Sequence, residues 1–588
     1  MKATHTFFKF YPPGAHYEEG GIRFTFASAK DSCGIIIYDK KTKRKLEEIP
    51  FSSEERLGNL HSALVTRYQP SDILYQFYEG TEPVPDRYGV CFADRGAYGK
   101  QEAGEDMKAG FITADFDWDN DKKPRIPYED SLIYLMHVRG FTQHPSSGVE
   151  HRGSFRGILE KIPYLREIGV NCVVLQPAYE FLETALPKLN YWGYQSGFYY
   201  APKAAYAAGD AVTELKELVR ALHKNGIELV LQFYFPKEVS AMEIPDILRY
   251  WVMEYHVDGF QLIGERLPAD AIAADPALAD TKLWYEFFDA DAKGSRDGAG
   301  KTGRLALCGD DYLCTMRRFL KGDEEMVQKA MLEMRRIPKN HRRIHYMSSY
   351  CGMTLMDMVS YDRKHNEANG EDNRDGTDYN YSWNCGEEGV SCKKKVLALR
   401  VRQVKNAMCM LMFSQSAPMI FMGDEFGNSQ KGNNNPYCQD NEITWLDWED
   451  KNRNRELFDF WKRLVKIRQT HPVFHQEKEP QLRDYIACGF PDLSYHGREA
   501  WAPETTNYSR SFAMMYCEKF VPSESRETLF WYLAMNMHWE KQEFAFPRVP
   551  AGWRWEVIIS TTSGENVTKT SVQVPARSIV LLSSVPEN

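Results

Sequence analysis

Ser131-Leu132-Ile133-Tyr134-Leu135 is an apolar run of strand length. It is followed by apolar residues at helical spacing over 158–168 and by a second apolar run, Cys172-Val173-Val174-Leu175. A strand, a helix and a strand in this order predict a parallel βαβ unit. The rhythm starts again with an amphipathic helical pattern over residues 212–224 and continues into the apolar run 227–231.

Further segments of strand length, made mostly of apolar residues, follow at residues 259–262, 282–285, 344–347 and 418–421. A chain that repeats the βα unit this often predicts an α/β fold, specifically a closed (β/α)8 TIM barrel. In such barrels the reactive side chains stand at the carboxyl ends of the strands. The strand ends are therefore the places to look for chemistry.

The pattern of apolar residues is different on both sides of this region. Before residue 125, short alternating segments such as Gly21–Phe26 and Gly34–Tyr38 are broken by turn residues, which is typical of an antiparallel β-sandwich. After a last helical pattern over 455–469, apolar strands return, for example at 553–557. We therefore predict an N-terminal β-sandwich (1–125), a barrel (126–477) and a C-terminal all-β domain (478–588), with a charged linker over 115–127.

The composition argues against several classes of protein. Hydrophobic residues make up 43% and charged residues 26% of the 588 residues, as in ordinary globular proteins, and a net charge of −9 argues against a nucleic-acid partner. The first residues contain no apolar segment behind a basic start, and no run of about 20 apolar residues occurs, so we expect neither a signal peptide nor a membrane span. The 12 cysteines show no metal-ligand spacing. We expect reduced thiols, a cytoplasmic location, no metal and no cofactor.

Several long motifs resemble bacterial glycogen-debranching enzymes and isoamylases of glycoside hydrolase family 13, the α-amylase superfamily. They are His137-Val138-Arg139-Gly140-Phe141-Thr142, Tyr191-Trp192-Gly193-Tyr194, residues 364–371, Gly423-Asp424-Glu425-Phe426 and residues 432–441. The resemblance implies a sandwich like a carbohydrate-binding module before the barrel. It also implies an α-glucan such as glycogen or branched maltodextrin as the ligand. In this family Trp192 and Tyr194 would belong to a loop that stacks on sugar rings.

The resemblance also shows where catalytic residues are expected, and most of those positions hold other side chains. The family's nucleophilic aspartate would stand at Ile263, and its neighbouring arginine at Gln261. Isoleucine has no lone pair, so it can neither attack a sugar carbon nor stabilise a positive charge on it. Four more positions are replaced in the same way: Gln232, Lys237, Tyr350 and Cys351. The family mechanism is therefore predicted not to operate.

One catalytic position is retained, because Glu286 falls where the family has its general acid. A retaining glycosidase needs a second carboxyl group about 5 Å away, and an inverting one needs a base about 6.5–9.5 Å away. Glu265, two residues past Ile263, is the candidate for such a base. A vestigial role for Glu286 is the favoured interpretation.

Three functions remain open at this point. The first is a pseudoenzyme that binds α-glucan or partners an active enzyme of glycogen metabolism. The second is an active hydrolase of α-1,6 branches that uses Glu286 with a relocated carboxylate. The third is a structural or regulatory subunit that no longer binds sugar.

Overall fold

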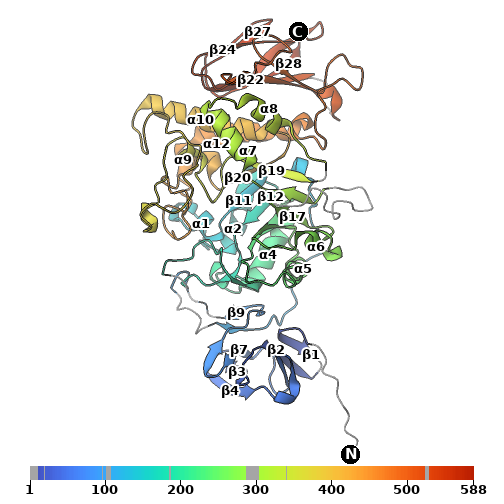
Figure 1. Ribbon diagram of the computed structural model, residues 1–588, viewed down its shortest axis with the longest axis vertical. Helices are drawn as coiled ribbons and strands as arrows, with labels where there is room; N and C mark the ends of the chain where they lie inside the picture. Colours follow the sequence, from blue (N-terminus) through green and yellow to red (C-terminus); the bar gives the residue numbers. More distant parts are fainter. Residues whose placement is uncertain are drawn as a thin grey trace, which may run out of the picture.

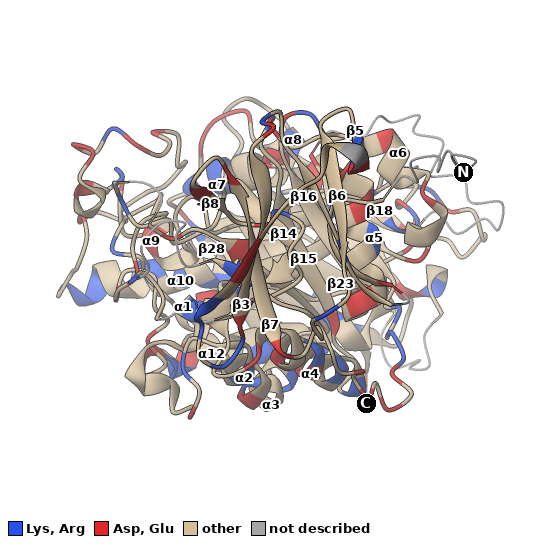
Figure 2. Cartoon of the chain, turned by 90° about the horizontal axis from the view of Figure 1, so that it is seen from below, with Lys and Arg blue, Asp and Glu red and all other residues tan. Residues whose placement is uncertain are grey.

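The structure is a computed structural model that describes residues 11–18, 20–93, 95, 97–100, 107–184, 187–286, 303–339, 341–522 and 529–587. Figure 1 shows three parts stacked along the long axis: an N-terminal β part, a central barrel with its helices, and a C-terminal β part. Seen from below, Lys and Arg lie interspersed with Asp and Glu (Figure 2). Among the described helices, none is both long enough and apolar enough to span a membrane.

The N-terminal part consists of two antiparallel sheets that enclose one apolar core. One sheet has the order β1-β2-β6-β5, and the other has the order β4-β3-β7-β10-β9, with β8 paired to β7. Its core includes Phe24, Ile35 and Phe77, all of which are fully buried. The strands are β1 Gly14–Glu18, β2 Gly21–Ala27, β3 Cys33–Asp39, β4 Lys45–Pro50, β5 Arg56–Leu57, β6 Leu60–Val65, β7 Ile73–Glu79, β8 Glu82–Val84, β9 Phe92–Ala93 and β10 Lys108–Ala109.

Eight parallel strands close into a barrel in the order β11-β12-β15-β16-β17-β18-β19-β20, which confirms the predicted fold class. The ring closes where β20 pairs with β11, with Ile133 opposite Met419. These strands are β11 Ile133–Met136, β12 Cys172–Leu175, β15 Glu228–Tyr234, β16 Gly259–Ile263, β17 Lys282–Tyr285, β18 Leu305–Leu307, β19 Arg342–Tyr346 and β20 Ala417–Phe421. The apolar runs predicted seven of these strands. The eighth, β18, is too short to stand out by its pattern.

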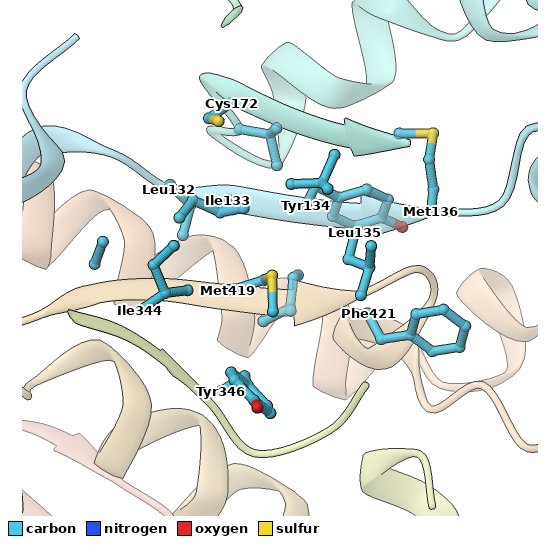
Figure 3. Packing of buried hydrophobic residues seen from close by; sticks show 14 of the residues in the cluster. Leu132, Ile133, Tyr134, Leu135, Met136, Cys172, Ile344, Tyr346, Met419 and Phe421 are labelled. Carbon is cyan, nitrogen blue, oxygen red and sulfur yellow. The ribbon is translucent and has the colours of Figure 1, made fainter. Parts of the chain in front are cut away.

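Near the closure, side chains of β11, β12, β19 and β20 pack against one another, including Leu135, Tyr346 and Phe421 (Figure 3). Every residue of β11 and β12 is buried, because the barrel interior covers one face and the helices cover the other. This explains why these strands are continuously apolar.

The helices surround the barrel. One predicted helix, over 158–168, is in fact two, α2 and α3, because Pro163 has no N–H to donate to the preceding turn. The helices are α1 Val138–Thr142, α2 Phe155–Glu160, α3 Ile162–Glu167, α4 Ala211–Lys224, α5 Ile244–Tyr255, α6 Ala269–Ala273, α7 Asp311–Lys321, α8 Val327–Arg335, α9 Leu355–Met358, α10 Lys394–Met412, α11 Asp450–Arg453 and α12 Arg455–Thr470.

Two features attach the N-terminal part to the barrel. A hairpin of β13 (Tyr179–Phe181) and β14 (Gly197–Pro202) follows β12, and its Phe198 ring packs edge-on against Phe92, with ring centroids 5.1 Å apart. The predicted linker has no helix or strand between 110 and 127 but is anchored to the barrel, because Asp121 contacts His223 and His256 through its carboxylate.

The C-terminal part contains a five-stranded sheet, β21-β22-β23-β28-β25, and a three-stranded sheet, β24-β27-β26, which confirms the predicted all-β character. One face of the larger sheet joins the barrel core, and the other face packs on the smaller sheet. The strands are β21 Leu493–His496, β22 Ser511–Cys517, β23 Phe530–Asn536, β24 Gln542–Ala545, β25 Trp553–Ser560, β26 Asn566–Val567, β27 Ser571–Val574 and β28 Ser578–Pro586. The exact domain boundaries remain predictions.

Candidate functional site

The carboxyl ends of β15, β16 and β17 bring together residues that the sequence singled out. Gln232 on β15 lies opposite Gln261 on β16, and Tyr234 lies opposite Ile263. The next pairing sets Gln261 against Trp284, and Ile263 and Glu286 each lie two residues beyond this last pair of β16 and β17. Side chains from three separate strands thus share one level of the barrel.

A chain of hydrogen bonds crosses this level. The Tyr194 hydroxyl donates to Gln232 Oε1 at 2.5 Å, and Gln232 Nε2 donates to Gln261 Oε1 at 2.7 Å. Gln261 Nε2 then approaches Cys308 Sγ at 3.5 Å. Gln232 is fully buried, so its amide depends on these two partners. The side-chain amides of the two glutamines thus provide hydrogen-bond partners for each other and for the Tyr194 hydroxyl.

Aromatic rings cover this chain. The ring of Tyr350 stacks on Tyr194 with centroids 5.1 Å apart, and the edge of Trp192 meets Tyr350 at 5.2 Å. Trp192 is only 8% exposed, whereas Tyr194 and Tyr350 are half-buried. Burial raises the pKa of both tyrosines, so their hydroxyls stay protonated. Tyr350 therefore covers part of the ring face that Tyr194 would offer to a sugar.

The loop that carries Trp192 and Tyr194 is held in place by packing at Tyr191 and Gly193. The Tyr191 ring stacks on His137, with centroids 4.0 Å apart, and burial lowers the pKa of His137 to about 4, which keeps the imidazole neutral. Gly193 has a φ of +80°, and a Cβ there would stand 2.5 Å from the Phe181 ring. Only glycine fits between the two aromatic residues.

Glu286 directly follows β17 and is exposed. Partial burial raises its pKa, and the negative charges of Asp310 and Asp311 raise it further. Asp310 is held by the Tyr346 hydroxyl, which donates to its Oδ1 at 2.7 Å. Burial, together with the charges of Asp310 and Glu286, raises the pKa of the Cys308 thiol to about 12. The end of β18 thus adds carboxylates to the neighbourhood of Glu286.

Three other candidate residues lie apart from the hydrogen-bonded chain. Lys237 is exposed in the loop after β15, and Cys351 is an exposed cysteine beside Tyr350. Glu265, the candidate base, is exposed in the loop after β16. The charges that act on Glu286 belong to Asp310 and Asp311, so these two are stronger candidates for a nearby carboxylate.

Cys308 and Asp310 were missed by the sequence interpretation because β18 was missed. The signal that would have found them is Cys308-Gly309-Asp310-Asp311, a polar group directly after a short apolar run. Among the described residues, no group of three or more His, Cys, Asp or Glu side chains is arranged to hold a metal ion.

The asparagine-rich runs near the barrel rim bond mainly to one another. Asn366 Nδ2 donates to Asn434 Oδ1 at 2.9 Å, and Asn434 Nδ2 donates to Asn380 Oδ1 at 2.7 Å. Asn366 and Asn434 are fully buried. These amides brace the rim of the barrel.

Comparison with known proteins places this geometry in context. The family described as "Alpha amylase, catalytic domain" matches residues 128–236. The chain is 30% identical to isoamylase 1, chloroplastic, of Oryza sativa subsp. japonica, over 94% of this chain and 81% of that protein. It is 33% identical to the glycogen operon protein GlgX homolog of Mycobacterium tuberculosis, over 82% and 79%. A pullulanase from Paenibacillus barengoltzii, solved with maltohexaose and α-cyclodextrin, has a similar fold: the TM-score is 0.70 at 17% identity, over 98% of this chain and 96% of that one.

Proposed function

Because the chain belongs to the isoamylase and glycogen-debranching group of the α-amylase family, which acts in α-glucan metabolism, we propose that it is a member that binds α-glucan without hydrolysing it. The observation that carries the proposal is the hydrogen-bonded chain Tyr194–Gln232–Gln261–Cys308. Neutral groups that bond one another occupy the level at which a glycosidase needs two carboxyl groups.

Loss of the family chemistry is supported at each neighbouring position. Ile263 offers no nucleophile at the end of β16, and Gln261 carries no charge to hold a carboxylate in place. Tyr350 fills space over Tyr194. Restoring a carboxylate at position 263 alone is therefore not expected to restore hydrolysis. Catalytic residues that act as a unit make contributions to the rate that are strongly non-additive.

Retained glucan binding is supported by the aromatic surface at the same strand ends. Tyr194, Tyr234 and Tyr350 are half-buried, and Tyr194 meets Tyr234 edge-on, with centroids 6.0 Å apart. Aromatic rings in such fixed positions suit the apolar faces of glucose units, and Glu286 offers an acceptor for hydroxyl groups. The solved pullulanase cited above binds maltohexaose, which makes a linear maltodextrin the first ligand to test.

The test combines an activity assay with a binding assay on the full chain. We expect no more reducing ends from glycogen or pullulan with the wild-type protein than with Glu286→Gln. We expect calorimetric titration with maltoheptaose to show saturable binding that Tyr194→Ala weakens. Tyr508→Ala is the matched control, because Tyr508 is 73% exposed on the C-terminal part. Hydrolysis that Glu286→Gln abolishes would refute the pseudoenzyme proposal.

A titration without heat would refute glucan binding and favour the third function, a structural or regulatory subunit. In that case the partner to test is an active enzyme of glycogen metabolism, and the measurement is whether the two proteins purify together as a complex. Hydrolysis and binding are measured separately, so the two halves of the proposal fail independently.

A second candidate function has one observation in its favour. Asp310 and Asp311 act on Glu286 electrostatically, and Asp310 is oriented by the Tyr346 hydroxyl. A raised pKa on Glu286 and a nearby carboxylate are what an inverting hydrolase of α-1,6 branches requires. If the wild-type protein hydrolyses pullulan and Asp310→Asn abolishes it, this function replaces the first.

A further inference from the structure

The linker before the barrel forms a tight turn that brings one carboxylate against the barrel. The Asp121 amide donates to the Trp118 carbonyl at 2.9 Å, and the two residues between them, Asp119 and Asn120, have φ values of +48° and +55°. Aspartate and asparagine tolerate this left-handed backbone better than most residues other than glycine. The Asp121 side chain that follows the turn is only 4% exposed.

Two histidines at the carboxyl ends of barrel helices contact this carboxylate. His223 lies in the last turn of α4, and its Nδ1 is 2.9 Å from both carboxylate oxygens of Asp121. His256 is the C-cap of α5, and its Nδ1 is 3.1 Å from Asp121 Oδ2. The partial negative charge at a helix carboxyl end favours a protonated imidazole. The attachment of the linker therefore depends on the charge of these two rings.

His223 has a carboxylate at each of its two ring nitrogens. Its Nε2 is 2.9 Å from Oδ2 of Asp258, the residue directly before β16. The side chains of His223 and Asp258 are 1% and 3% exposed, so water does not mediate these contacts. An ionised carboxylate only accepts hydrogen bonds, so both nitrogens must donate, and an imidazole with two N–H groups is the protonated form. Binding both carboxylates therefore requires a positively charged His223.

The other charged groups on the surrounding elements do not replace this charge. Three ion pairs are matched within themselves: Glu228 with Lys282, Lys216 with Glu254, and Arg125 with Asp280. Lys123 of the linker donates to the Val257 carbonyl at 2.7 Å, and its charge acts on Asp258 and Asp121. Lys123 and a protonated His223 thus balance the two carboxylates, whereas a neutral His223 leaves one negative charge in excess.

Deprotonation of His223 weakens one contact more than the others. A neutral imidazole keeps one N–H group, so one of its two carboxylates faces a nitrogen lone pair. Asp258 also accepts from the Leu229 amide at 2.7 Å and lies within the barrel framework. Asp121 lies in a segment without helix or strand, and its other histidine partner, His256, has a side chain that is 32% exposed. The contact that gives way is therefore the one between His223 and Asp121.

The residues beside Asp121 contact the same helix ends. The Trp118 ring stacks on His256 with centroids 3.8 Å apart, a contact that a protonated imidazole strengthens through cation–π attraction. The Arg220 guanidinium of α4 lies 4.9 Å from the centroid of the Phe116 ring. Residues 116–121 therefore form one docked segment on α4 and α5, and loss of the Asp121 contact loosens the whole segment.

We propose that Asp121, His223 and His256 form a pH-sensitive latch, which holds the linker on the barrel while His223 is protonated and releases it when His223 is neutral. The N-terminal part is joined to the barrel through this linker, so the latch sets how firmly the two parts are connected.

The direction of the pH dependence follows from the charges around His223. Burial opposes protonation, but hydrogen bonds and charges from Asp258 and Asp121 outweigh it and raise the pKa of His223. The stabilisation of the latched linker is therefore complete below about pH 6.5 and is lost as the pH rises through the raised pKa. Over this range the equilibrium shifts toward the released linker by up to about tenfold for each pH unit.

The test measures trypsin cleavage after Lys122 in the full-length protein between about pH 6 and about pH 9. Lys122 is exposed and directly follows Asp121, and a protease needs a locally released segment to bind its substrate. The readout is the cleavage rate of His223→Gln divided by that of the wild type at the same pH, so the pH dependence of trypsin cancels. We expect a ratio of about ten at pH 6 that falls toward one at pH 9. Mass spectrometry identifies the cut.

Two further variants make the result specific to the latch. Asp121→Asn removes the carboxylate from the same contact, so it should also speed cleavage at acidic pH, and the double variant should be little faster than either single one. His151→Gln is the matched control, because His151 contacts Glu160 at 3.1 Å within the barrel and lies away from the linker. Its ratio to the wild type should stay near one at every pH.

A ratio for His223→Gln that stays constant or grows with pH would overturn the proposal, as would an equal effect of His151→Gln. Cuts spread over the whole chain at high pH would show general loosening and would equally exclude a local latch. If circular dichroism shows that His223→Gln does not fold, the wild type and Asp121→Asn decide the question: their cleavage rates must differ at acidic pH and converge at alkaline pH, and rates that keep the same ratio refute the latch.

Discussion

Gln232 is the residue whose removal most directly tests the self-satisfied site. Its side chain is fully buried, accepts a hydrogen bond from Tyr194 and donates one to Gln261. Gln232→Met keeps the length and most of the volume but removes both polar atoms. The Tyr194 hydroxyl and Gln261 Oε1 then each lose a partner.

The expected cost follows from those two groups. A polar group left without a partner costs about 1–3 kcal/mol, with the lower end appropriate to half-buried groups that water can reach. Gln261 and Tyr194 are half-buried, so we expect the free energy of unfolding to fall by about 2–4 kcal/mol. Urea unfolding, followed by tryptophan fluorescence and circular dichroism, measures the change in the transition that includes the barrel.

Two further variants make the measurement specific. Gln328→Met, at an exposed position of α8, should change the unfolding free energy by no more than about 0.5 kcal/mol. The double variant Gln232→Met with Gln261→Met removes both members of one hydrogen bond and should cost less than the sum of the single changes. A cost for Gln232→Met no greater than that for Gln328→Met, or full additivity, would refute the hydrogen-bonded chain as a stabilising unit.

Three other predictions concern the rest of the barrel. Burial opposes protonation of His223, but hydrogen bonds and charges from Asp258 and Asp121 outweigh this effect and raise the pKa of His223. The contribution of His223 to the free energy of unfolding is therefore complete below about pH 6.5 and is lost as the pH rises through the folded-state pKa. The gap in unfolding free energy between wild type and His223→Gln should therefore be larger at about pH 6 than at about pH 9, and a gap that grows with pH would contradict this. Arg317 is buried and donates to three backbone carbonyls, so Arg317→Met should lower the unfolding free energy by about 3–5 kcal/mol in the same urea assay, and a neutral result would show that those carbonyls find other donors. Asp310→Asn should lower the pKa of Glu286, measured by NMR titration of its side-chain carboxyl, because one of the charges that raises it is removed, and an unchanged pKa would place that charge too far away to act.

Much of the fold could be predicted from periodicity. The runs that became β12 and β20 are continuously apolar because both faces of these strands are covered, so they can be recognised in the sequence. The strand β18 could not be predicted in the same way, since three residues carry no period. Its absence from the prediction hid Cys308 and Asp310, although the polar run after it was visible.

The residue types alone determined one functional statement: whatever the tertiary structure, Ile263 cannot supply a nucleophile, because its side chain has no lone pair. Only the tertiary structure decided what the other replacements do. Gln232 meets Tyr194 across 38 positions of sequence and Gln261 across 29, and Tyr350 reaches Tyr194 from a different strand end. Hydrogen bonds and packing between distant segments depend on where closure of the barrel brings the strand ends and loops, and local sequence patterns carry no record of that.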